Sequence, residues 1–326
     1  MTLKNFWTHL RLYDRLTFGY LWFTLLLTAF SPKSLPIRDR ILLSHLAVSI
    51  AIVLLIYWGQ WRSQTHRHYI PPKWLQFLRD WHPLLWFTFF LFGEFTYLAN
   101  LIFPYWIEKH LIQFDLWLFG QPPHLFFAKN LPPWSVEMAA FAYWSYYPII
   151  FGIAARYYFF PSKNGQNLTG NLTFVDFMNR LCLAFYVCYV LFMIIPARSP
   201  RHALNLSGQL SLTGGPFYHM IATLQNYISV VGAAFPSSHV AVAWVALLTL
   251  RDDHPLAFWS LMPMVIVLTM SIFFLQYHYV LDAVFGVILA AAFEWLWRRV
   301  YFKKATFAAT RLPPFLVTET SSNSLT

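Results

Sequence analysis

Long apolar segments constrain this chain more than any other feature of its sequence. A helix needs about 20 mostly apolar residues to cross a bilayer. Eight segments reach or approach that length: Leu16–Phe30, Ile41–Trp58, Pro83–Tyr105, Trp134–Phe160, Phe174–Pro196, Gly232–Leu250, Pro255–Phe274 and Tyr279–Trp297. The first is the shortest, and an interfacial helix or a signal anchor is an alternative for it. We predict an all-α fold, a polytopic transmembrane helical bundle of about six to eight spans.

The composition supports a membrane protein and excludes two other classes. Hydrophobic residues make up 58% of the chain and charged residues 11%. A soluble domain carries about 25% charged residues, so an ordinary soluble enzyme is excluded. The 33 Phe, 18 Tyr and 15 Trp exclude a disordered chain, because such chains lack large apolar side chains.

The basic residues indicate a membrane topology. The formal net charge is +10, which in a soluble protein would suggest binding to nucleic acid. Here the Lys and Arg residues mostly lie in short loops between apolar segments, so we expect a bilayer with anionic lipid as the partner and no nucleic acid. With the N-terminus in the cytoplasm, 16 of the 23 basic residues fall on the inside. We therefore expect both termini inside, in a plasma or inner membrane.

The organisation along the chain follows from the apolar segments. We expect N-terminal membrane helices over 1–79, a catalytic helical bundle over 80–300, and a disordered cytoplasmic tail over 301–326. Glu108–Pro133 mixes charges and prolines and is predicted to be an amphipathic helix on the outer surface. Arg198–Val231 is predicted to be a long outer polar loop, and loops of that length are usually functional.

Three polar clusters interrupt the apolar sequence, and the predicted topology puts all of them on the extracytoplasmic side. They are Pro196–His202 after the fifth span, Phe235–His239 opening the sixth, and Gln276–Asp282 opening the eighth. Charged groups inside a bilayer are costly, so such clusters are candidates for a functional site.

His278 and Asp282 form the first candidate pair. They are four residues apart and would share one face of a helix. A carboxylate that accepts a hydrogen bond from one ring nitrogen fixes the tautomer and stabilises positive charge, which a histidine nucleophile needs. The structural alternative is a capping carboxylate beside a histidine at a helix end.

The other two clusters could hold an anion. Ser237 and Ser238 would place hydroxyls and unpaired N–H groups at a helix N-terminus, with His239 beside them as a proton donor. Arg198 and Arg201 are three apart, and guanidinium groups match phosphate oxygens bidentately. The structural alternatives are ordinary serine capping and arginines that contact lipid headgroups.

The helix lengths allow the two histidines to meet. The chain descends from His239 to Asp253 over ~21 Å and returns from Pro255 to Phe274 over ~28 Å, at 1.5 Å per residue. We therefore expect the two imidazoles to converge near one membrane surface.

These motifs resemble a known family. Phe235-Pro-Ser-Ser-His239, followed about 40 residues later by Tyr277-His-Tyr-Val-Leu-Asp282, resembles the type-2 phosphatidic acid phosphatase (PAP2) superfamily. Pro196-Ala-Arg-Ser-Pro-Arg201 and Asp115-Leu-Trp-Leu-Phe-Gly120 are similar to its inositolphosphotransferase branch, which includes the inositol phosphorylceramide synthases.

The resemblance implies roles for individual residues. His278 would take the phosphoryl group as a phosphohistidine, Asp282 would orient it, and His239 would protonate the leaving oxygen. The phosphate oxygens would be held by Ser237, Ser238, Arg198 and Arg201. The expected activity is that of a lipid phosphate phosphatase or phosphotransferase. No metal or other cofactor is expected, because the arginines and the helix N-terminus supply positive potential.

The sequence departs from the phosphatase pattern at two positions. The pattern has a Lys before an Arg-Pro pair and an Arg six residues before the nucleophile, where this chain has Ile272. The closest polar residue there is Gln276. A phosphodiester carries less charge than a phosphomonoester, so these departures favour transfer from a phospholipid to a lipid alcohol such as ceramide.

Two alternatives of other classes are kept. His239 and His278 could be axial ligands of a haem in an electron carrier, but that gives the arginines and Asp282 no role. The chain could also be a lipid transporter or lipid-binding relative without catalysis. The oligomeric state is not predicted.

Other polar residues inside the spans have simpler interpretations. Glu94 and Glu137 are expected to make interhelical hydrogen bonds, and Glu294 to pair with Arg298 four residues later. Cys182 and Cys188 suit neither a redox pair nor a zinc site.

Overall fold

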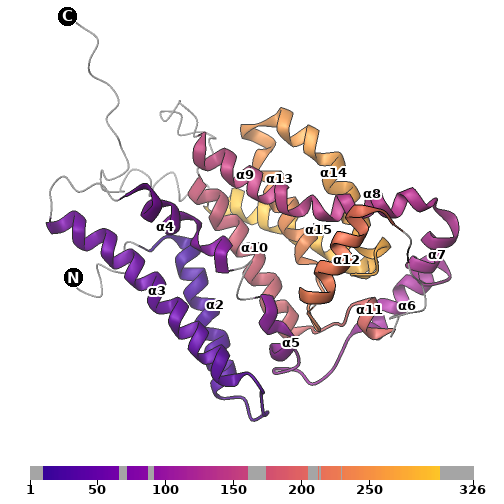
Figure 1. Ribbon diagram of the computed structural model, residues 1–326, viewed down its shortest axis with the longest axis horizontal. Helices are drawn as coiled ribbons and strands as arrows, with labels where there is room; N and C mark the ends of the chain where they lie inside the picture. Colours follow the sequence, from indigo (N-terminus) through magenta and orange to yellow (C-terminus); the bar gives the residue numbers. More distant parts are fainter. Residues whose placement is uncertain are drawn as a thin grey trace, which may run out of the picture.

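The computed structural model describes residues 10–65, 72–86, 92–160, 174–204, 212, 214–228 and 230–301. These residues form α-helices joined by turns, and no strand is found among them (Figure 1). The predicted all-α membrane bundle is confirmed. The tail beyond Tyr301 lies outside the described residues.

Five helical segments are long and apolar enough to cross a membrane: Arg38–Trp58, Trp134–Phe159, Phe174–Ile194, Pro255–Phe274 and Val280–Arg299. They correspond to α3 (Arg38–Thr65), α8 (Pro133–Trp144) with α9 (Tyr146–Phe159), α10 (Phe174–Ile194), α14 (Pro255–Phe274), and α15 (Val280–Leu296) with the π-helical turn η3 (Trp297–Tyr301). The structure therefore describes an integral membrane protein.

Three of the eight predicted spans are not among these five segments. Leu16–Phe30 lies largely within α2 (Leu12–Ala29), and Gly232–Leu250 becomes helical only at the start of α13 (Ser238–Asp253). Pro83–Tyr105 is not one helix. Its first residues complete α4 (Lys73–Trp86), and its later ones form the short helices η2 (Phe92–Glu94) and α5 (Phe95–Leu98) before Asn100 takes a positive φ.

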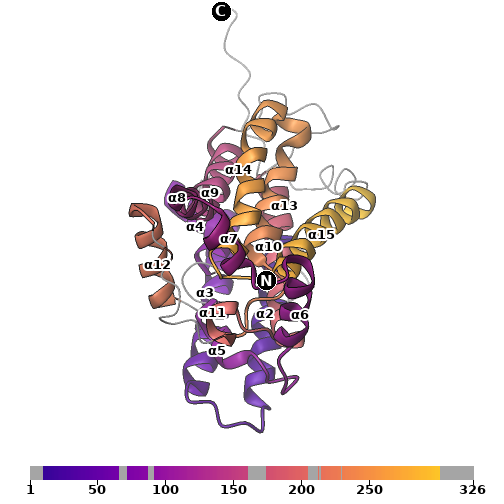
Figure 2. The same ribbon diagram turned by 90° about the vertical axis from the view of Figure 1, so that its right-hand side faces the viewer.

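Helix α13 is the centre of the bundle, where it packs against α10, α14 and α15 (Figure 2). Small side chains make this possible, because Ala241, Ala243 and Ala246 are fully buried in its faces. Gly286 of α15 faces the start of α13 so closely that a Cβ atom there would lie 2.9 Å from the Ser237 carbonyl oxygen. The tight α13–α15 contact therefore fixes the two histidine-bearing segments relative to each other.

The predicted surface helix over Glu108–Pro133 is two helices, α6 (Glu108–Phe119) and α7 (Pro123–Asn130). The break comes at Gly120, whose φ of +68° suits a glycine at a helix C-terminus. The polarity of α6 is reversed relative to a soluble protein. Glu108 and Asp115 are buried, whereas Trp117 is 76% exposed. This face suits contact with lipid.

The predicted loop Arg198–Val231 is partly helical. It contains the short helix α11 (Pro200–Ala203) and the longer α12 (Pro216–Ile228), which packs on α8. Cys182 and Cys188 are both free and buried in α10.

The N-terminal helices are tied to the bundle by buried polar contacts. The Tyr13 backbone N–H donates to Asn179 of α10 at 2.9 Å, and the Tyr186 hydroxyl of α10 donates to Thr17 Oγ1 of α2 at 2.9 Å. The domain boundary at residue 80 stays a prediction.

Candidate active site

His278 lies in the turn between α14 and α15, with its ring orientation fixed by two acceptors. Its Nδ1 atom is 2.8 Å from the Ala234 carbonyl oxygen and 3.2 Å from Asp282 Oδ2. A carbonyl oxygen can only accept a hydrogen bond, so Nδ1 carries the proton. The lone pair is therefore on Nε2, which is the atom available for nucleophilic attack.

Asp282 has a structural role as well as its contact with His278. Its Oδ2 atom accepts the Tyr279 backbone N–H at 2.8 Å in the first turn of α15, and its side chain is fully buried. One carboxylate therefore makes both the capping contact with the Tyr279 N–H and the contact with the His278 ring.

Ser237 joins the second cluster to the third. It is the N-cap of α13, where its hydroxyl accepts the Val240 N–H, and its own N–H donates to the Asp282 carbonyl oxygen at 3.1 Å. Its Oγ atom lies 3.5 Å from His278 Nε2. Ser238 is buried at the first helical position. The start of α13 therefore lies next to Nε2 of His278.

The structure brings the two histidines together. The ring centroids of His239 and His278 are 6.2 Å apart, with an interplanar angle of 62°. Reacting atoms approach to about 3–3.5 Å before bond formation, so one phosphorus centre can reach both rings. The predicted convergence of the two motifs at one end of the bundle is confirmed.

His239 is surrounded by aromatic residues that the sequence interpretation did not single out. Its Nε2 atom lies 3.2 Å from the Tyr143 hydroxyl, and the Tyr146 ring packs at 4.6 Å between centroids. Gln225 of α12 donates to the same Tyr143 hydroxyl at 2.9 Å. Tyrosines in an apolar segment are typical of a core, so the sequence held no signal for this contact.

The two arginines have different surroundings. Arg198 forms an ion pair with the buried Glu108 of α6, with Nε 2.6 Å from Oε1, and it stacks on Trp106. The Arg201 guanidinium carbon lies 4.6 Å from the centroid of the Tyr277 ring, and Tyr277 directly precedes His278 in the sequence. Within the described part of the chain no carboxylate pairs with Arg201.

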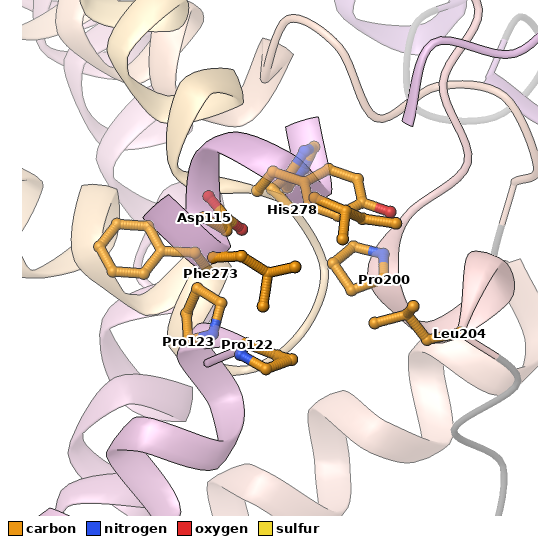
Figure 3. A pocket seen from close by; sticks show the side chains of 10 residues that line it. Asp115, Pro122, Pro123, Pro200, Leu204, Phe273 and His278 are labelled. Carbon is orange, nitrogen blue, oxygen red and sulfur yellow. The ribbon is translucent and has the colours of Figure 1, made fainter. Parts of the chain in front are cut away.

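A narrow pocket opens beside His278 (Figure 3). It holds about 300 Å³ including its open mouth, and it is lined by His278, Asp115 and apolar or proline residues of α6, α7, α11 and α14. Figure 3 shows Pro200 on one side and Pro122 and Pro123 on another. The pocket therefore lies between His278 and helices α6 and α7.

Asp115 is a pocket residue that the sequence analysis noted only as part of a motif. Its Oδ1 atom accepts the Val280 N–H at 3.2 Å. Burial is the main reason that the pKa of Asp115 is raised to about 7; the hydrogen bond from Val280 opposes this rise, and the negative charge of Asp282 adds to it. The Asp115 carboxyl group is therefore partly protonated near neutral pH.

The position that carries an arginine in the phosphatase pattern is apolar in space as well as in sequence. The Ile272 side chain is fully buried, and its carbonyl oxygen accepts the Tyr277 and His278 N–H groups at 2.9 and 3.1 Å. Gln276 is buried with a φ of +68°, which closes this turn.

The other membrane carboxylates make the contacts expected of them. Glu94 contacts Ser44 and His45 of α3, and Glu137 of α8 accepts the Phe217 N–H of α12 at 2.7 Å. Glu294 pairs with Arg298 and also with Arg180 of α10. Among the described residues no three His, Cys, Asp or Glu side chains cluster as a metal site would require. That the chemistry needs no metal stays a prediction.

Comparison with known protein families gives one match. The family model described as PAP2 superfamily matches residues 109–296. This chain belongs to the PAP2 superfamily. No curated protein and no solved structure matches it. The match to the PAP2 model covers α6 to α15 and so includes every predicted site residue, whereas α2 to α5 lie outside it. PAP2 membership together with the membrane-type helices supports a lipid phosphatase-type function.

Proposed function

We propose that this protein is an integral-membrane enzyme that cleaves lipid phosphate esters through a phosphohistidine formed on His278. The observation that carries the proposal is the geometry of the two rings. The Nδ1–H of His278 is held by Ala234 and Asp282, which leaves Nε2 free, and the His239 ring is centred 6.2 Å away.

The first step of the proposed reaction is a transfer to nitrogen. The lone pair of His278 Nε2 forms a bond to phosphorus while the bond from phosphorus to the leaving oxygen breaks. His239 gives its proton to that oxygen. The phosphorylated imidazole keeps its Nδ1–H, and the Asp282 carboxylate stabilises the positive charge that develops there.

The second step releases the phosphoryl group. Water or a lipid alcohol attacks phosphorus, its proton passes to His239, and the phosphorus–nitrogen bond breaks. Both histidines then return to their starting protonation states. The phosphoryl oxygens lie within reach of Ser237, Ser238 and the N–H groups that open α13, and Arg201 and Arg198 add positive charge.

Trapping of the intermediate tests this mechanism. Purified protein mixed with phosphorus-labelled lipid phosphate and quenched in base is expected to retain label, and acid is expected to remove it, as for a phosphohistidine. His278→Ala is the control, and it should show neither label nor turnover. Activity of His278→Ala within about tenfold of wild type contradicts the nucleophile assignment, because covalent catalysis cannot survive loss of the nucleophile.

A second candidate activity is transfer of a phospho-headgroup from a phospholipid to a lipid alcohol, as in the inositol phosphorylceramide synthases. Buried Ile272 at the phosphatase arginine position and the Arg198–Glu108 ion pair favour it. Both reduce the positive charge available, which suits the single charge of a phosphodiester. Labelled phospholipid incubated with and without ceramide or diacylglycerol separates the two, since only a transferase makes a new labelled lipid.

The remaining alternatives have direct tests. The bis-histidine haem is not favoured, because each Nε2 faces a protein hydroxyl, from Tyr143 or Ser237. A Soret band in purified protein would revive it. A non-catalytic lipid carrier would bind lipid equally well after His278→Ala but show no turnover in wild type.

We also propose that the site faces the extracytoplasmic side, on the charge distribution of the loops. A cysteine placed at the exposed Tyr227 of α12 should react with an impermeant maleimide added to intact cells. Reaction only after lysis would contradict that orientation.

A further inference from the structure

His239 has a hydrogen-bond partner that differs in kind from the partner of His278. The Tyr143 hydroxyl lies 3.2 Å from His239 Nε2, and the two rings stack with centroids 5.1 Å apart. Tyr143 belongs to α8 and is 1% exposed. The contact is therefore a buried one between α8 and α13.

The Tyr143 hydroxyl is itself held in place from α12. The Gln225 side-chain amide donates to the hydroxyl oxygen at 2.9 Å. Glu137, two turns before Tyr143 on α8, fixes the start of α12 by accepting the Phe217 and Tyr218 N–H groups at 2.7 and 3.1 Å. Helix α12 is thus anchored to α8 at both ends of their contact, and Gln225 has a defined position.

The chemistry of the two partners matches two different tasks. A carboxylate such as Asp282 stabilises positive charge on its histidine, which suits the ring that becomes phosphorylated. A phenol is neutral and can either donate or accept a hydrogen bond. Its oxygen has two lone pairs, so it can accept from His239 Nε2–H and from Gln225 together. A histidine held in this way keeps that hydrogen bond when it gives up its Nδ1 proton and when it takes one back.

We propose that Tyr143, held by Gln225, is the positioning residue of His239: its hydroxyl oxygen accepts the Nε2–H of His239 throughout, which fixes the ring and leaves the Nδ1–H as the proton that is given to the leaving oxygen and later taken back. This inference rests on the proposed function, in which His239 protonates the leaving oxygen. Neither residue touches the phosphoryl group in this scheme.

The test compares leaving groups. Tyr143→Phe keeps the ring stacking and removes only the hydroxyl. We expect kcat to fall about ten- to a hundredfold on a lipid phosphate with an alkyl alcohol leaving group, part of the roughly 10²–10⁴-fold that general acid catalysis contributes. On the corresponding nitrophenyl ester, whose leaving group needs no proton, we expect a change within about twofold. An equal loss on both esters overturns the proposal, because a merely structural residue affects both alike.

Tyr157→Phe is the matched control. Its hydroxyl bridges α9 to α13 by donating to the carbonyl oxygen of Thr249 at 3.0 Å, and Thr249 lies ten residues after His239 on α13. Its effect should be the same on both esters. A leaving-group preference in this control as strong as that of Tyr143→Phe also overturns the proposal.

Gln225→Leu tests the same contact through a different helix and remains informative if Tyr143→Phe folds poorly. It should reproduce the selective loss on the alkyl ester at smaller size, and it should add nothing in the Tyr143→Phe background, since coupled residues are not additive. Fully additive losses overturn the coupling. If wild-type protein turns over neither ester, the proposed function fails. If wild type is active and Tyr143→Phe loses both activities equally, only the positioning role fails.

Discussion

The Ala234 carbonyl oxygen lies closer to Nδ1 of His278 than the Asp282 carboxylate does, at 2.8 Å against 3.2 Å. The tautomer of His278 is therefore fixed by the backbone, and we expect the carboxylate to act mainly through its charge. This separates two functions that a single aspartate performs in a Ser-His-Asp triad.

Asp282→Asn should consequently retain more activity than the equivalent change in a triad, which costs about 10⁴-fold. We expect a loss of roughly 10²-fold, because stabilisation of the charged ring is lost while its orientation is kept. Measurement of kcat for Asp282→Asn beside His278→Ala checks this. If the two variants are equally inactive, the carbonyl of Ala234 does not hold the tautomer.

Gly286→Ala should destabilise the protein and lower its activity together. The added Cβ would lie 2.9 Å from both the Ser237 carbonyl oxygen and Val240 Cβ, so α15 must move away from α13. Overpacking of this kind costs about 1–3 kcal/mol. Gly152→Ala is the control, because it also lies within a helix and meets nothing within 4 Å. Thermal unfolding in detergent should show a lower Tm for Gly286→Ala alone.

Asp115→Asn should change how stability depends on pH. Burial raises the pKa of Asp115 to about 7, above the value of about 4 expected in the unfolded chain. Between these two pKa values the unfolded state releases the proton and the folded state keeps it. The contribution of Asp115 to the free energy of unfolding therefore falls as the pH rises. The Tm of Asp115→Asn relative to wild type should therefore increase from pH 5 to pH 8. A difference that is flat across this range contradicts the assignment.

Substitution of Arg198 should affect stability, whereas substitution of Arg201 should affect substrate binding. Arg198→Ala leaves Glu108 buried without its partner, so Tm should fall, and Glu108→Gln should partly restore it in the double variant. Arg201→Ala should leave Tm nearly unchanged and lower kcat/KM by about tenfold or more, since a charged hydrogen bond to phosphate contributes about 1.5–3 kcal/mol. The reverse pattern would make Arg198 the phosphate ligand.

The sequence was sufficient to predict the bundle and the meeting of the histidine motifs, for a physical reason. Long apolar segments indicate a bilayer directly. Helix α14 packs along α13 and returns the chain to the same end of the bundle, where the ring centroids of His239 and His278 lie 6.2 Å apart.

The partners of these residues could not be predicted in the same way. Ala234 contributes only a backbone carbonyl, which no residue type signals, and Tyr143 contacts His239 across 96 positions of chain. Glu108 neutralises Arg198 through a contact between two segments 90 residues apart. The break between Pro83 and Tyr105 was missed because hydropathy alone does not register a turn such as the one at Asn100.

The reversed polarity of α6 has a kinetic consequence. This helix lines the pocket and its Trp117 is exposed, so we expect the entrance to the site to lie in the interfacial layer of the bilayer. Substrate would then reach the site by diffusion in the plane of the membrane. The reaction velocity would depend on the mole fraction of substrate among the surrounding lipids. Dilution by inert lipid would therefore slow the enzyme even when the bulk concentration of substrate is held constant.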